Sequence, residues 1–184
     1  PKRHTQHRAP DGALYAEELF GVEGFTGRSS LLYHLVPPTR THKIEAVREI
    51  VLEEADDGYH HHRLIDAAGV EPHGDAVTGR IPLFFNNDVV MGVVRPADPM
   101  PAHLFYRNGE ADEMLFVHEG TGLLDTMFGP LRYGPGDYLV VPIGTTWQLI
   151  PDADSAQRML YLECPSEIEP PKRYRNEFGQ LLEH

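Results

Sequence analysis

Short apolar runs rich in β-branched and aromatic residues recur at regular intervals between Arg80 and Cys164. Turn residues separate them, among them Asn86-Asn87-Asp88 and Gly134-Pro135-Gly136. The runs are IPLFFNNDVVMGVVRP, LFYRN, EMLFVHEG, GLLDTMF, PLRYGPGDYLVVPIGT, WQLI and RMLYLEC. Several short strands at this spacing predict an all-β sandwich or barrel.

The pattern before Arg80 is less regular. Leu14–Pro38 is apolar and aromatic but interrupted by glycines, which predicts an extended, packed arm with a strand at Leu31–Leu35. Lys43–Glu54 has apolar residues spaced for an amphipathic helix, but its Val and Ile residues also allow two short strands. After Cys164 the chain becomes polar and rich in proline, which is typical of a linker.

These patterns predict three parts: an N-terminal arm at 1–40, a barrel at 41–164 and an exit arm at 165–184. A chain that begins without Met and stops at Leu181-Leu182-Glu183-His184 is expected to have trimmed or missing ends.

Charge and composition narrow the class of protein. With 16 Lys and Arg against 28 Asp and Glu, the net charge is −12, which argues against nucleic-acid binding. The basic cluster from Lys2 to Arg8 is expected to be a frayed terminus. Cys164 is the single cysteine, so no internal disulfide can form. No apolar run reaches the ~18 residues of a membrane span. A cytoplasmic protein is the expectation.

Two spaced motifs lie within the regular β region. Glu113 is followed after six residues by Gly120, and Gly136 is followed after five residues by Pro142-Ile143-Gly144 and then Trp147. These spacings resemble the two motifs of cupins, whose fold is an antiparallel jelly-roll β-barrel. Metal-binding cupins place His-x-His before the Glu and a third His after the Pro-x-Gly.

The residues at those positions here are unsuited to a metal. Tyr106 and Asn108 stand where the His-x-His pair is expected, and Trp147 stands at the third His; only Glu113 remains. An indole has no lone pair for coordination. The sequence therefore predicts no metal site but a vestigial cupin pocket of these four residues, in which Tyr106 and Trp147 fill the barrel and Glu113 or Asn108 satisfies their polar tips.

Other histidines offer weaker metal candidates. His60 and His62 would share one face of a strand, although a solvated turn explains them better. His103 and His118 lie near the motifs, so iron held by Glu113 with one of them is a further hypothesis. No G-x-S-x-G motif is present, and Cys164 has no His nearby in sequence, so nucleophilic catalysis lacks support.

Beyond the cupin motifs, three blocks resemble the N-terminal half of the homogentisate 1,2-dioxygenase family. They are LYAEELFGVEGFT with SSLLYHLVPP, then NNDVVMGVVRP, and then FYRNGEADEMLFVHEGTGLLDTMFGPLRYGPGDYLVVPIGTTWQL. The blocks occur in the family's order and span most of residues 13–150. The resemblance implies a double-barrel oxidoreductase that assembles into trimers and hexamers. Its Fe(II) and O2 chemistry opens homogentisate to maleylacetoacetate in tyrosine and phenylalanine catabolism.

By the same resemblance, two His and one Glu hold the iron in the second, C-terminal barrel. No catalytic residue and no iron ligand are therefore expected in this chain, which would be the structural, oligomer-building half of an extradiol-type ring-cleaving dioxygenase. The expected partners are the C-terminal cupin half and further copies of the same protein. The alternative is a stand-alone cupin that binds a small molecule between Tyr106 and Trp147 without metal.

Overall fold

The computed structural model describes residues 5–46, 49–55, 62–176 and 178–182, which form two compact units, 1–51 and 52–184. The first unit contains a β-hairpin of β1 (Ala16–Gly21) and β2 (Ser29–His34). His34 Nε2 lies 2.7 Å from Glu18 Oε2 across the hairpin. The predicted strand at Leu31–Leu35 corresponds to β2, which begins at Ser29 and ends at His34, and β1 is a further strand that was not predicted.

The segment Lys43–Glu54 also departs from expectation. Its described residues form neither the predicted helix nor strands. Ile44, Ile50 and Val51 are 87%, 68% and 66% exposed, so no apolar stripe is buried that could stabilise a helix. Residues 47–48 of this segment, the start of the basic N-terminus and His60 lie outside the described residues.

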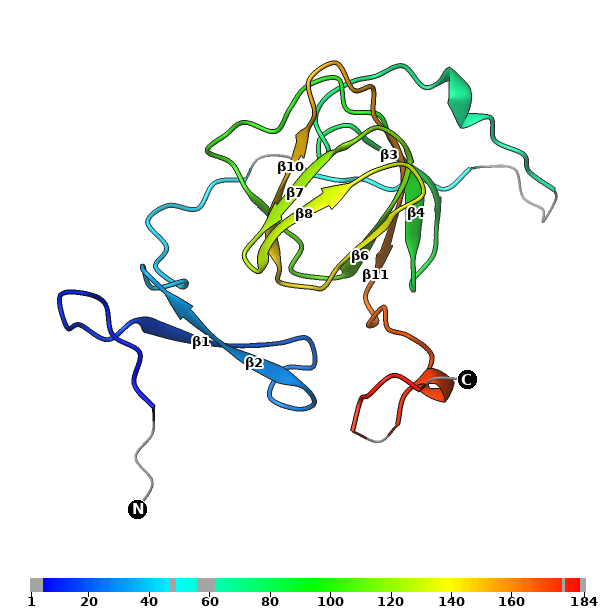
Figure 1. The fold of residues 1–184 in the computed structure, drawn as a ribbon. Coiled ribbons are helices and arrows are strands. Elements are labelled where there is room, and N and C mark those ends of the chain that lie inside the picture. Colours follow the sequence, from blue (N-terminus) through cyan, green and yellow to red (C-terminus); the bar gives the residue numbers. More distant parts are fainter. Residues whose placement is uncertain (1–4, 47–48, 56–61, 177, 183–184) are drawn as a thin grey trace. The chain divides into compact units, whose positions relative to one another are not determined.

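The second unit is a barrel of two antiparallel sheets (Figure 1). The five-stranded sheet has the order β3-β4-β11-β6-β9, with β3 at Arg80–Phe85, β4 at Val90–Val94, β11 at Arg158–Cys164, β6 at Asp112–Glu119 and β9 at Tyr138–Val141. The four-stranded sheet has the order β5-β10-β7-β8, with β5 at Tyr106–Arg107, β10 at Thr146–Pro151, β7 at Gly122–Thr126 and β8 at Gly129–Tyr133.

All seven apolar runs between Arg80 and Cys164 form the strands predicted for them, and the all-β barrel is confirmed. Two 3₁₀ turns, η1 (Ala67–Gly69) and η2 (Lys172–Tyr174), are the only helical elements among the described residues. No helix in this part of the chain is long and apolar enough to span a membrane.

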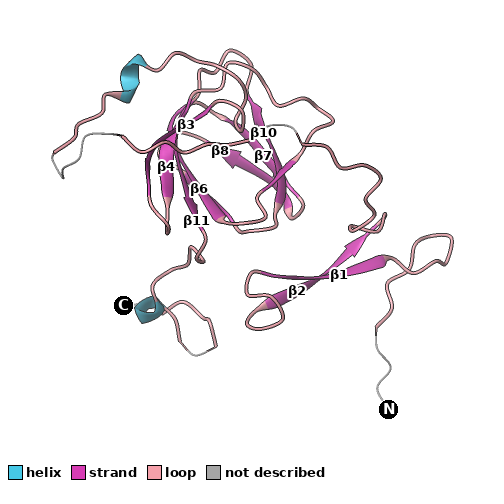
Figure 2. Ribbon diagram, turned by 180° about the vertical axis from the view of Figure 1, so that it is seen from behind, coloured by secondary structure: helices cyan, strands magenta, loops and turns pink. Residues whose placement is uncertain are grey.

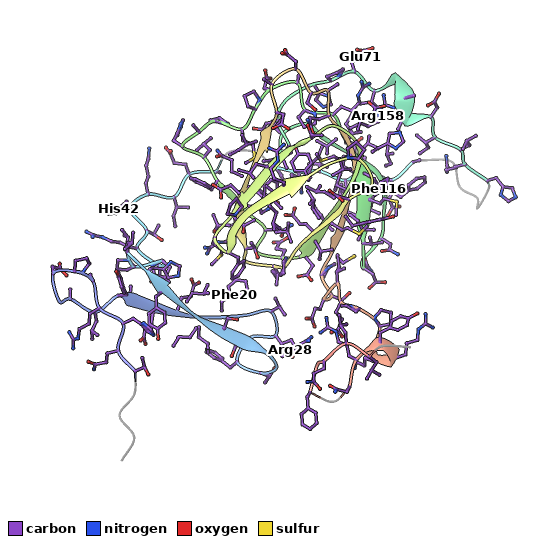
Figure 3. All side chains as sticks on the ribbon, viewed as in Figure 1. Phe20, Arg28, His42, Glu71, Phe116 and Arg158 are labelled. Atoms are coloured by element: carbon purple, nitrogen blue, oxygen red, sulfur yellow. The ribbon has the colours of Figure 1, made fainter. Side chains whose placement is uncertain are left out.

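The core lies between the two sheets because alternate residues of each strand point inward. Figure 2 shows the five-stranded sheet from the side opposite to Figure 1. The buried cluster joins side chains from both sheets: Val94, Leu115, Val117, Leu139, Val141, Met159 and Tyr161 from the five-stranded sheet, and Leu124, Tyr133, Trp147 and Leu149 from the other. Side chains crowd this interior (Figure 3).

Candidate functional site

Strand pairing brings the two aromatic residues of the cupin motifs together. Tyr106 on β5 is the direct cross-strand partner of Trp147 on β10. Their ring centroids are 5.3 Å apart with the planes at 70°, an edge-to-face arrangement. Trp147 is 0% exposed, whereas Tyr106 is partly buried. The rings therefore pack on each other inside the barrel.

Glu113 on β6 points into the same interior and is 2% exposed. Its Oε2 accepts a hydrogen bond of 3.1 Å from the indole Nε1–H of Trp147. Burial and the negative charge of Glu113 raise the pKa of Tyr106 to about 12. Glu113 thus satisfies the polar tip of the buried indole, as a buried N–H requires.

Asn108 belongs to a turn and not to this cluster. Its Oδ1 accepts from the backbone N–H groups of Glu110 and Ala111 at 2.9 and 3.0 Å. Such bonds are typical of an Asx turn, which here orders the connection from β5 to β6. The side chain therefore has a local structural role.

Arg80, the first residue of β3, completes the cluster and was missed by sequence reasoning. Its Nη1 donates to Glu113 Oε1 and to Glu163 Oε1, both at 2.6 Å. The Arg80 side chain is 7% exposed. Nε also donates to the carbonyl of Ala76 at 3.2 Å. A guanidinium thus lies in the barrel interior, bonded to the carboxylate that a metal-binding cupin uses as ligand.

Three aromatic rings surround this cation. The guanidinium carbon lies 5.2 Å from the ring centroids of Tyr106 and Tyr161 and 6.0 Å from that of Trp147. These distances lie within the range of cation–π attraction. Burial works against the charge of Arg80, but the carboxylates of Glu113 and Glu163 outweigh it, and the pKa of Arg80 is raised.

The register of the sheet explains why a cation is needed. Glu113 on β6 and Glu163 on β11 are direct cross-strand partners. Two carboxylates facing each other would repel, and burial would strengthen the repulsion. Arg80 neutralises part of this charge. We name Arg80, Glu113, Glu163, Tyr106 and Trp147 the Arg80 cluster.

The Arg80 cluster does not fit a metal ion. Both oxygens of Glu113 already accept hydrogen bonds, one from Arg80 and one from Trp147. A divalent cation beside the guanidinium would meet a like charge. No group of three or more His, Cys, Asp and Glu side chains with metal-binding geometry occurs in the described part of the chain.

The described residues do not bring His103 or His118 into a metal-binding group with Glu113. His118 is exposed and lies five residues after Glu113 on β6, so it points to the opposite face of the strand. His103 is also exposed, while Glu113 is buried and engaged. His62 is exposed as well, and its predicted companion His60 is not described.

Two surface hollows occur elsewhere on the second unit. One, of about 240 Å³, is lined by Phe105, Asp125, Thr126, Met127 and Thr146. The other, of about 550 Å³, lies between Arg95–Pro99 and Pro151–Gln157. No member of the Arg80 cluster lines either hollow.

No family model matches the chain. The chain is 40% identical over 182 residues to a protein of Saccharolobus solfataricus named "Putative dioxygenase". The alignment covers 99% of this chain but 46% of that protein. The chain therefore spans about half the length of the curated relative it matches.

The solved structures that match the chain are more distant in sequence. A "putative mannose-6-phosphate isomerase" from Ralstonia eutropha aligns with 54% of this chain and 94% of its own, at 20% identity and a TM-score of 0.46. A cupin-2 domain protein from Shewanella frigidimarina aligns with 46% of this chain and 78% of its own, at 19% identity and a TM-score of 0.39. The strand order of the two sheets is that of a cupin-type jelly roll.

Proposed function

We propose that this chain is the N-terminal, metal-free cupin half of a homogentisate 1,2-dioxygenase-like enzyme. Its role is structural: it supports the catalytic half and helps to build the oligomer. The full-length enzyme opens the aromatic ring of homogentisate with Fe(II) and O2 to give maleylacetoacetate. The Fe(II), which supplies the oxygen chemistry, is held outside this chain.

One observation carries the structural role. The barrel interior, where a catalytic cupin holds its metal, is occupied by the guanidinium of Arg80, bonded to Glu113 at 2.6 Å. The indole of Trp147 holds the second oxygen of Glu113. With both carboxylate oxygens engaged, this barrel has no ligand set for iron.

The comparisons support the dioxygenase part of the proposal. The relative named as a putative dioxygenase is matched along 99% of this chain and is about twice as long. A filled barrel in one half leaves the chemistry to the other half. The sequence blocks that resemble homogentisate 1,2-dioxygenase point to homogentisate as the substrate of the whole enzyme.

An isolated two-stranded hairpin is marginally stable, which supports a role in assembly. The hairpin β1–β2 has this form, and its cross-strand pair Leu19 and Leu31 is 58% and 43% exposed. Exposed leucines on a marginal hairpin favour burial against another copy. We propose that this hairpin is an interface element of a trimer or hexamer.

The experiment compares the full-length wild type with Glu113→Gln and the matched control Glu119→Gln, which changes a 46% exposed side chain of the same strand. Iron per folded polypeptide and homogentisate-dependent O2 uptake are measured on the monodisperse fraction. We expect one iron per polypeptide in all three proteins, and O2 uptake with homogentisate in the wild type.

Loss of iron from Glu113→Gln alone would refute the metal-free role of this barrel. An intact polypeptide of only 20.7 kDa would leave a stand-alone cupin and remove the ring-cleavage assignment. In that case, soaking with aromatic acids and observing density between Tyr106 and Trp147 would identify a binding module.

A further inference from the structure

Outside the Arg80 cluster, the five-stranded sheet carries apolar residues on both faces. Residues of its inner face belong to the buried core, so the alternate residues point outward. The registers place these outward side chains in two rows, each crossing all five strands. The first row is Ile81, Val93, Leu160, Phe116 and Tyr138, and the second is Phe84, Met91, Leu162, Met114 and Val140. We name these ten side chains the outer apolar face.

The outer apolar face contains no charged residue, although 24% of the chain is charged. Phe84, Tyr138 and Val140 are 44%, 64% and 43% exposed. Phe116, labelled in Figure 3, packs against Tyr138 with ring centroids 4.8 Å apart. The other side chains of this face are partly buried, and Val93 is 8% exposed. Exposed apolar side chains gathered on one face of a sheet mark an interaction site.

The four-stranded sheet provides an internal comparison. Its outward side chains include Arg107, Asp125 and Arg132 beside Ile150 and Leu123. This mixture is what an antiparallel sheet presents to water. The strands of the five-stranded sheet instead read as nearly continuous apolar runs, such as MLFV in β6 and YLVV in β9. Such runs are typical of strands that are covered on both faces.

We propose that the outer apolar face is the docking surface for the second half of the same polypeptide, the half that holds the iron. This inference rests on the proposed function, which supplies that second half. The inner face of the sheet then packs against the barrel core, and its outer face packs against an apolar layer of the second half.

Two observations favour this occupant over a second copy of the chain. The relative matched along 99% of this chain is about twice as long, which supports the proposed second half on the same polypeptide. β11, the central strand of the face, is the last barrel strand, and the chain leaves it at Cys164. A segment tethered there meets the face at high effective concentration.

The exit from β11 is fixed to the same sheet. Asp112, at the start of β6, accepts from the backbone N–H of Ile168 at 2.8 Å through Oδ2. Its Oδ1 accepts from the N–H of Ile143, also at 2.8 Å. Asp112 is 3% exposed. The carboxylate thus anchors the exit arm at the start of β6, which limits the directions that the following residues can take.

The test uses the full-length polypeptide, with the photo-cross-linking residue p-benzoylphenylalanine in place of Val140. The matched control carries it in place of Ile150, a β-branched residue of similar exposure, 40% against 43%, on the outer face of the other sheet. After irradiation, the products are separated by mass and the cross-linked peptides are sequenced. We expect an intrachain cross-link from position 140 to residues beyond 184, and its loss when the probe is at position 150.

Three results would overturn the proposal: an interchain product from position 140, an intrachain link to residues 1–51, or no link from position 140. Each of these leaves the proposed function standing if the same sample contains one iron per polypeptide and consumes O2 with homogentisate. An intact mass of 20.7 kDa would instead overturn both.

A second measurement compares Val140→Glu and Ile150→Glu in the full-length protein. Hydroxyl-radical labelling of Met91, Met114 and Tyr138 reports access to the outer apolar face. We expect increased labelling of these three side chains in Val140→Glu and no change in Ile150→Glu. Equal labelling of wild type and Val140→Glu would contradict the docking.

Discussion

Arg80 Nη1 lies 2.6 Å from Glu113 Oε1, and the two side chains are 7% and 2% exposed. Thirty-three positions separate them in the sequence, yet they form the central ion pair of the barrel. Because Glu163 shares the same nitrogen at 2.6 Å, one cation serves two carboxylates. The single positive charge of Arg80 thus offsets part of the negative charge of Glu113 and Glu163 without a metal.

Replacing Arg80 tests this charge balance. Arg80→Met keeps much of the side-chain volume but leaves two buried carboxylates without their cation. Breaking one partner out of a buried ion pair costs about 3–5 kcal/mol. We expect a loss of this order in the free energy of unfolding, measured by urea denaturation.

Arg132→Met is the matched control for that substitution. Arg132 pairs with Asp152 at 2.6 Å, but the two side chains are 63% and 37% exposed. Solvent screens such a pair, so a much smaller loss is expected. Equal losses in Arg80→Met and Arg132→Met would contradict the central role of Arg80.

Trp147 is the single tryptophan, and it is 0% exposed. Native tryptophan fluorescence therefore reports the barrel interior alone. We expect emission that iodide does not quench until the protein unfolds. Trp147→Phe keeps a ring but removes the donor to Glu113, which is expected to cost roughly 1–3 kcal/mol of unfolding free energy. Quenching in the native state would show that the interior is open to solvent.

The raised pKa of Tyr106 predicts how the free energy of unfolding changes at alkaline pH. Its pKa is raised by burial and by Glu113 from 10.0 to about 12. A raised pKa in the folded state means that the contribution of Tyr106 to stability is complete below pH 10 and is lost as the pH rises towards 12. Burial also raises the pKa of Tyr133. We therefore expect an ultraviolet titration of Tyr106→Phe to show one late-ionising tyrosine fewer than that of the wild type. Ionisation of Tyr106 near pH 10 would contradict its burial beside Glu113 in the Arg80 cluster.

Gly92 tests the packing beneath the Arg80 cluster. A Cβ at this position would lie 2.1 Å from the carbonyl oxygen of Ile81 and 2.6 Å from Cε1 of Tyr161. Overpacking of this kind costs about 1–3 kcal/mol, and Gly92→Ala is expected to lose that much unfolding free energy. At Gly109 no atom lies within 4 Å, so Gly109→Ala is expected to change stability by less than about 0.5 kcal/mol. A neutral Gly92→Ala would show a looser interior.

The strands of the barrel could be predicted because their apolar runs and turns are local signals. The β1 strand could not: its sequence AEELFG has two glutamates, and its partner β2 lies beyond a glycine-rich connection. A helix was predicted for Lys43–Glu54 because its apolar residues have helical spacing. Ile44, Ile50 and Val51 are exposed, so no buried apolar face stabilises a helix there.

The candidate site was predictable in part. Glu113 and Trp147 could be found from motif spacing, but they lie on different sheets and meet only across the barrel interior. Arg80 could not be predicted, because an arginine at the start of a strand is expected to lie in solvent. Only the folded barrel brings it to Glu113 and Glu163. Two carboxylates facing each other on adjacent strands would have indicated a buried cation. That Glu113 and Glu163 face each other follows from the register of β6 and β11, which is known only from the folded structure.

The central claim is that Arg80 occupies the place of a metal in this barrel. Its most direct test is anaerobic loading of the 184-residue chain with Fe(II), followed by gel filtration and metal analysis. The account predicts iron well below one per chain, with no difference between the wild type and Glu113→Gln. One iron per wild-type chain, lost in Glu113→Gln, would contradict it.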